Sequence, residues 1–155
     1  MAKQRIFDVL IVAKHAGLRS ACRAVLELTP EMRVCGEAAY CGEGLCLFRN
    51  RRPDLVVLFL SFRYAGELWL IRQIKRIAPA ARVLVLAIRG EADEQVAAHR
   101  CREAGADAFV RNTGESAQLM EAVRAVLEWE RQPEHPLYAA AEGDPRASLL
   151  GAASA

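Results

Sequence analysis

Short apolar runs of strand length recur along the chain, and stretches with helical periodicity separate them. The five runs cover residues 7–12, 32–37, 55–60, 82–87 and 108–111. Strands that are apolar throughout are typical of parallel sheets that helices bury on both faces. Alternation of strands and helices also requires right-handed crossovers. The pattern therefore predicts an α/β fold, a flavodoxin-like (βα)5 doubly wound parallel sheet with strand order 2-1-3-4-5.

The helical stretches have recognisable faces and ends. Leu18, Cys22 and Leu26 fall at i, i+4 and i+8, on one face of a first helix. Further helices are predicted at residues 42–50, 68–75, 93–103 and 119–127. The second is expected to end before the residue that precedes Pro53, because proline disfavours helical geometry there. Gly105 is expected to cap the fourth.

Composition and charge disfavour several classes of protein. Hydrophobic residues make up 53% and charged residues 26% of the sequence, as in globular proteins. The net charge of +2 is too small to mark a nucleic-acid binder. No apolar run approaches the roughly 20 residues that span a bilayer, and no secretory apolar region opens the chain. We therefore expect a cytoplasmic protein without direct contact to nucleic acid or membrane.

One domain and a tail account for the length of 155 residues. Residues 132–155 are rich in proline, glycine and alanine and have no sustained amphipathic face. We expect a single domain at 1–131 and a flexible C-terminal tail at 132–155.

The five cysteines form no CxxC pair of the kind usual in zinc and redox sites. Neither a metal site nor another cofactor is expected. Cys41 and Cys46 are candidates for exposed, reactive thiols, so a thiol-based sensor is one alternative function.

Ligands of doubly wound sheets bind beyond the carboxyl ends of the strands. The residues at those ends are expected to line the functional pocket of this chain. They are Ala13, Lys14, Phe59, Ala87 and Asn112.

Several stretches of the sequence match the successive blocks of a known family. They include GEAA at residues 36–39, RPDLVVL at 52–58 and AGADAFV at 104–110. Over about residues 6–130 the chain resembles the receiver domain of bacterial response regulators, especially those of the NarL/FixJ type. The segment around the fourth helix is a few residues longer than in that pattern.

The resemblance implies a phosphorylation site that this chain lacks. Such receivers are phosphorylated on an aspartate at the end of the third strand. An acidic pair beside it holds magnesium, and a hydroxyl residue and a lysine lie nearby. Here Phe59 stands at the acceptor position, Ala13 and Lys14 at the acidic pair, and Ala87 and Asn112 at the last two. Phenylalanine has no lone pair to attack phosphorus, and magnesium requires hard oxygen ligands.

Other acids are badly placed to substitute. Asp54 lies five positions before Phe59, roughly 16 Å along an extended strand, and Asp8 is similarly far from Lys14. A shift of register is disfavoured because the apolar runs fix which residues face the core. We therefore expect Phe59 to fill, as core, the space of the ion and the phosphoryl group. A conventional phosphorylated single-domain response regulator is the other alternative.

Two surfaces are candidates for partner binding. Trp69 lies off the apolar stripe of its helix and is expected to be exposed, in a patch with Tyr64 and Phe62. The second surface carries Arg100 and Arg102 on the fourth helix, where receivers often dimerise. Elsewhere on the surface, residues 75 and 76 are expected to form a solvated edge.

These observations predict a stand-alone pseudo-receiver that is not an enzyme. No helix-turn-helix output unit fits in the tail. The protein is expected to act through a protein partner, either a regulator or a component of a kinase pathway, with homodimerisation as a further possibility. Control of transcription would then be exerted through that partner.

Overall fold

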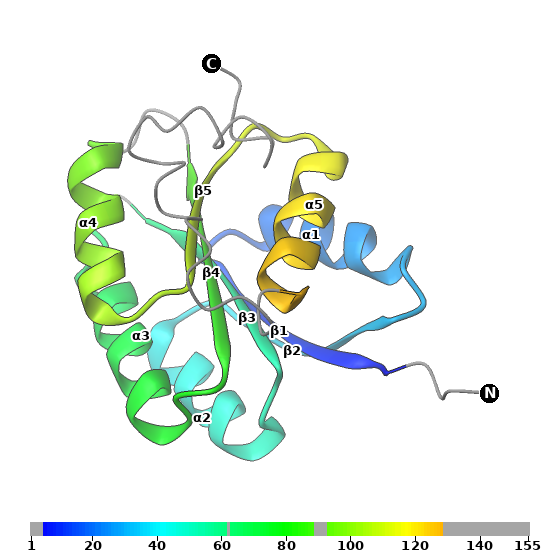
Figure 1. Ribbon diagram of the computed structural model, residues 1–155, viewed down its shortest axis with the longest axis horizontal. Coiled ribbons are helices and arrows are strands. Elements are labelled where there is room, and N and C mark those ends of the chain that lie inside the picture. The colour runs from blue at the N-terminus through cyan, green and yellow to red at the C-terminus, as the bar shows by residue number, and fades with distance from the viewer. Residues whose placement is uncertain (1–4, 62, 89–92, 129–155) are drawn as a thin grey trace.

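The computed structural model describes residues 5–61, 63–88 and 93–128 of the chain. Five strands form one sheet in the order β2-β1-β3-β4-β5, and every neighbouring pair is parallel (Figure 1). The strands are β1 (Phe7–Val12), β2 (Met32–Ala38), β3 (Leu55–Leu60), β4 (Arg82–Ile88) and β5 (Ala108–Asn112). The predicted fold and strand order are confirmed. The proposed tail and Phe62 lie outside the described residues.

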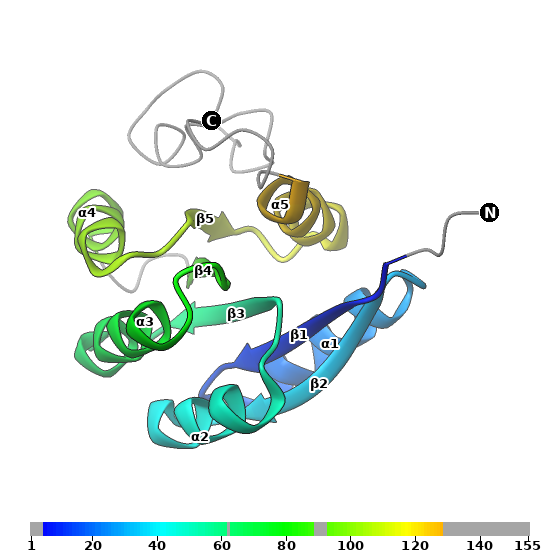
Figure 2. The ribbon, with the colours of Figure 1, turned by 60° about the horizontal axis from the view of Figure 1, so that its bottom comes forward.

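Helices cover both faces of the sheet. They are α1 (Ala16–Glu27), α2 (Cys41–Arg51), α3 (Ala65–Ile77), α4 (Glu94–Ala104) and α5 (Ser116–Glu128). Figures 1 and 2 show α1 and α5 on one face of the sheet and α2, α3 and α4 on the other. None of the helices in the described ranges combines the length and hydropathy that a bilayer-crossing segment needs.

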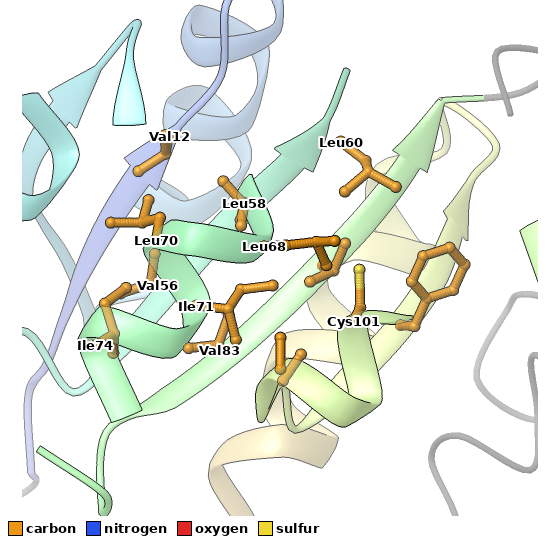
Figure 3. Packing of buried hydrophobic residues seen from close by; sticks show 14 of the residues in the cluster. Val12, Val56, Leu58, Leu60, Leu68, Leu70, Ile71, Ile74, Val83 and Cys101 are labelled. Carbon is orange, nitrogen blue, oxygen red and sulfur yellow. The ribbon is translucent and has the colours of Figure 1, made fainter. Parts of the chain in front are cut away.

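The central strand β3 is buried along its whole length. Because side chains alternate across a strand, Val56, Leu58 and Leu60 pack in the layer of α2, α3 and α4. Figure 3 shows this side of β3 beside the apolar residues of α3. Leu55, Val57 and Phe59 pack on the opposite side, against α1 and α5. This double burial fixes which face each residue of β3 occupies.

The helix ends agree with the sequence pattern. The helix α2 ends at Arg51, and Arg52 follows in the left-handed region with φ 47° before Pro53. The helix α4 begins after Asp93, whose carboxylate accepts hydrogen bonds from two backbone amides of the first turn. It ends at Ala104 and is capped by Gly105, whose φ of 114° is the left-handed conformation that glycine adopts most readily. The predicted end of α2 and the predicted Gly105 cap are therefore confirmed.

The expected solvated edge at residue 75 is wrong. The Lys75 ammonium lies 2.6 Å from a carboxylate oxygen of Asp107 and donates to the Ala81 carbonyl. The same Asp107 oxygen accepts from the Val83 amide at 2.8 Å. These bonds join the end of α3 to the starts of β4 and β5 at the amino edge of the sheet. Arg76 is exposed, as expected.

Truncation of a buried residue on α3 tests the layer that supports β3. Ile71→Ala is expected to lower the free energy of unfolding by about 2–4 kcal/mol, because it leaves a cavity in a fully buried position. The exposed neighbour Arg72→Ala is the control and is expected to change it by about 0.5 kcal/mol or less. Urea denaturation measures both. Equal effects of the two substitutions would contradict this packing.

Candidate functional site

The carboxyl ends of β1, β3 and β4 present apolar side chains where the sequence pattern places a ligand site. Ala13, Phe59 and Ala87 are buried, and Phe59 is 7% exposed. Ala13 and Phe59 belong to the core layer of α1 and α5, whereas Ala87 belongs to the opposite layer. In the ladder Phe59 is paired with Leu86, and Leu60 with Ala87. The side chain at position 59 is therefore part of the core, where the sequence predicts an apolar residue.

A cavity of about 220 Å³ lies at this edge of the sheet. Of the five predicted pocket residues, Lys14 and Phe59 line it. Its other described lining residues come from neighbouring loops, strands and the first turn of α1: His15, Leu18, Leu60, Ser61 and Ile88. Ala13, Ala87 and Asn112 lie at the strand ends but outside this lining. The described lining thus combines the cationic Lys14 with four apolar residues.

Asn112 serves the turn after β5. Its side-chain oxygen accepts a hydrogen bond from the Gly114 amide at 3.1 Å, and Gly114 has a φ of 85°. The preceding Arg111 makes an ion pair with Glu94 of α4. The Asn112 side chain thus stabilises the turn after β5.

The loop between β1 and α1 is held by an arginine. Arg19 donates one hydrogen bond to the Ala13 carbonyl at 2.7 Å and another to the Lys14 carbonyl at 3.2 Å. His15 is the N-cap residue of α1, and its side chain makes no capping hydrogen bond. The backbone of Lys14 is therefore fixed, while its side chain is exposed at the positive end of a helix dipole.

Glu67 closes the loop after β3. One of its carboxylate oxygens accepts from the Ser61 hydroxyl at 2.6 Å and from the Ser61 amide at 3.0 Å. The other accepts from the Cys41 thiol at 3.5 Å. Sequence reasoning missed this residue. An acidic residue in the first turn of a helix was the available signal, but such residues are common for dipole reasons alone.

The alternative acids lie at the far edge of the sheet. An oxygen of Asp54 accepts from the Asp8 amide at 2.8 Å, and Asp8 in turn pairs with Arg33 at 2.7 Å. Both carboxylates thus stabilise the amino edge. The prediction that neither substitutes at position 59 agrees with this geometry.

The two candidate thiols have different environments. Burial, followed by the charge and hydrogen bond of Glu67, raises the pKa of the Cys41 thiol to about 12. A reactive thiol needs a lowered pKa, so Cys41 is the opposite of what the sensor alternative requires. Cys46 is exposed on α2.

The candidate interaction residues are largely at the surface. Trp69 is 42% exposed, as predicted, whereas Tyr64 is half-buried and packs on the core layer of α2, α3 and α4. Arg100 and Arg102 are both exposed on α4. The expected aromatic patch therefore reduces, within the described residues, to Trp69 with part of Tyr64.

Comparison with known proteins finds regulatory proteins similar to this chain, although no protein-family model matches it. One relative is a Pseudomonas aeruginosa protein whose name provisionally describes it as a transcriptional regulator. It is 34% identical over 119 residues, which cover 77% of this chain and 56% of that protein. The nitrate/nitrite response regulator protein NarL of Escherichia coli is 24% identical over 123 residues, or 79% of this chain and 56% of NarL. The chain spans about half the length of the curated relatives it matches.

Solved structures agree with these relatives. The crystal structure of a two-component response regulator of the LuxR family from Aurantimonas has a TM-score of 0.71 and 30% identity. The match covers 79% of this chain and 86% of that one. The receiver domain of a Mycobacterium tuberculosis response regulator, provisionally named NarL, has a TM-score of 0.70. Its identity of 21% supports the fold alone.

Alkylation separates the two thiols. At pH 7.5 a thiol with a pKa near 12 has roughly three orders of magnitude less thiolate than one near 8.5. Iodoacetamide is therefore expected to modify the exposed Cys46 long before Cys41, whose pKa is about 12. Glu67→Gln removes a charge that raises the pKa of Cys41, so it should speed modification there. Peptide mass spectrometry reads both sites, and equal rates in the native protein would contradict the environment described.

Proposed function

Because this chain belongs to the receiver-domain family of NarL- and LuxR-type response regulators, we propose that it is a degenerate receiver that signals without phosphorylation. It acts by binding another protein in a two-component or transcription-control pathway of the cytoplasm. The observation that carries the proposal is the burial of Phe59, at 7% exposure, in the place of the phosphate acceptor.

The chemistry of acyl phosphate formation supports this proposal. The reaction needs a carboxylate nucleophile at the end of β3, and a phenyl ring has no electron pair that can attack phosphorus. The described lining of the adjacent cavity includes Lys14 and His15 but no carboxylate. Within the described part of the chain, both candidate acids of the sequence lie at the opposite edge and are engaged there.

The residues at this edge do not fit the magnesium ion that phosphorylated receivers hold. Magnesium binds through one or two carboxylates and its remaining water ligands. Ala13 and Phe59 provide only hydrocarbon, and the ammonium of Lys14 repels a cation. No step of the proposed function passes through a metal.

Without a phosphoryl group, the domain lacks the ligand that shifts ordinary receivers between two conformations. Its output is then set by its abundance or by the state of its partner. The face of α4, β5 and α5 is the leading binding surface, with Arg100 and Arg102 exposed on α4. We propose homodimerisation through this face. Trp69 on α3 marks the second candidate surface, because exposed tryptophan is enriched in binding sites.

Phosphorylation is tested directly with acetyl phosphate and magnesium. We expect intact-mass spectrometry to detect no added phosphate, since Phe59 cannot form an acyl phosphate. A receiver with an aspartate at the acceptor position, treated in parallel, controls for reagent activity. A stoichiometric phosphate that hydroxylamine removes would contradict the proposal.

Charge reversal on α4 tests the proposed dimer surface. Arg100→Glu is expected to shift the monomer–dimer equilibrium toward monomer by about tenfold, because a rim charge contributes modestly to association. The control Arg49→Glu makes the same charge change on α2 and is expected to leave it unaltered. Sedimentation velocity measures both, with Trp69→Ala as a probe of the second surface. Self-association that neither Arg100→Glu nor Trp69→Ala alters would place the interface elsewhere.

A further inference from the structure

The cavity at the carboxyl edge lies where the direction of chain crossover changes. The strand β1 lies between β2 and β3, so the connections leaving β1 and β2 run in opposite directions across the sheet. Open α/β sheets bind ligands in the crevice at such a switch point. Lys14 and His15 come from the end of β1, and Leu60 and Ser61 from the end of β3. The cavity is thus formed by the two loops that flank this point.

One side of the cavity is basic. Lys14 and His15 line it, and no ion pair joins the Lys14 ammonium to any residue in the described ranges. The start of α1 adds positive potential, because the His15 side chain does not cap it. The nearby carboxylate of Glu67 is engaged by the Ser61 amide and hydroxyl. Among the described lining residues, an anion would meet the Lys14 ammonium and no carboxylate.

The remaining lining is mainly hydrocarbon. It includes Phe59, Leu18 and Ile88, and Phe59 and Leu18 belong to the same layer of the core. Phe59 and Leu60 are almost completely buried in the remainder of the core. The volume of about 220 Å³ corresponds to roughly seven waters at about 30 Å³ each. A ligand that matches both sides has one anionic group and a short apolar body.

We propose that this cavity binds a small carboxylate with an aliphatic or aromatic body, whose charged group pairs with Lys14 and whose body packs on Phe59 and Leu18. The inference rests on the proposed function, since it requires that no acyl phosphate forms at this edge. It also supplies that function with an input, because a ligand that prefers one conformation shifts the population toward it. In this proposal Phe59 and Lys14 belong to one binding site, which takes an anion where a phosphorylated receiver would hold a cation.

The choice of ligand class follows from the lining. A divalent cation is repelled by Lys14 and finds no carboxylate among the described lining residues. Inorganic phosphate would pair with Lys14 but would leave the apolar lining residues in contact with water. A purely apolar molecule would leave the ammonium without a partner. A monocarboxylate of about the size of hexanoate satisfies both halves.

The test uses the full chain and three probes: hexanoate, hexylammonium and inorganic phosphate. Amide chemical shifts are followed by NMR during titration of each probe. Hexanoate is expected to bind with a Kd on the order of 1 mM, as suits so small a ligand. The shifts should concentrate at residues 14–18, 59–61 and 88. Hexylammonium and phosphate should bind at least about tenfold more weakly.

Matched variants identify the cation. Lys14→Gln is expected to weaken hexanoate binding by about tenfold, because it removes a charge-assisted interaction. Arg76→Gln removes the same charge from an exposed position at the end of α3 and should leave binding unchanged. Lys14 is exposed, so the variant should keep the native spectrum, which the same experiment verifies.

The outcomes separate this inference from the proposed function. Absence of hexanoate binding, shifts elsewhere on the domain, or equal loss in both variants would overturn the ligand site. Binding of phosphate as tight as that of hexanoate would overturn the amphipathic ligand class. Each of these results leaves the degenerate receiver intact as long as acetyl phosphate adds no mass. A phosphorylated product would instead overturn the proposed function, whatever hexanoate does.

Discussion

Burial of β3 on both faces is the constraint on which the rest of the structure depends. All six residues of the strand are buried, and their alternation assigns each to one of two core layers. A slip of one residue would exchange the two sets and place every side chain in the wrong layer. The register therefore fixes Phe59 at the carboxyl end and keeps Asp54 at the amino edge. The identity of the residue at position 59 then decides what chemistry the domain can perform.

The carboxyl edge of the sheet carries Lys14, His15 and several apolar residues around a small cavity. The surrounding loops are closed by internal contacts, from Arg19 on one side and Glu67 on the other. Contacts within the chain thus hold both loops that line the cavity, as the small-carboxylate site that we propose there requires.

Local periodicity in the sequence predicted most of the fold, but it could not predict specific side-chain contacts. The strand starts and the helix caps follow from apolar runs, proline and glycine, and the burial of Phe59 follows from the register. The bonds of Glu67 with Cys41 and of Lys75 with Asp107 join segments distant in sequence and leave no periodic signal, and the nearby bond of Glu67 with Ser61 leaves none either. The role of Asn112 in its turn depends on the conformation of Gly114. The sequence predicted five strand-end residues as the pocket lining, but only Lys14 and Phe59 are among the described lining residues of the cavity, a distinction that requires the three-dimensional geometry.

The free energy of unfolding of Phe59→Asp tests the central claim most directly. A carboxylate at this position would lose the packing of the ring and lie at an apolar site, so we predict a loss of about 3 kcal/mol or more. Phe59→Leu, which keeps an apolar side chain, is the matched control and should cost about 1.5 kcal/mol or less. Urea denaturation with and without magnesium gives both values. A Phe59→Asp variant as stable as the native protein, or one restored by magnesium, would contradict an apolar site that excludes the ion.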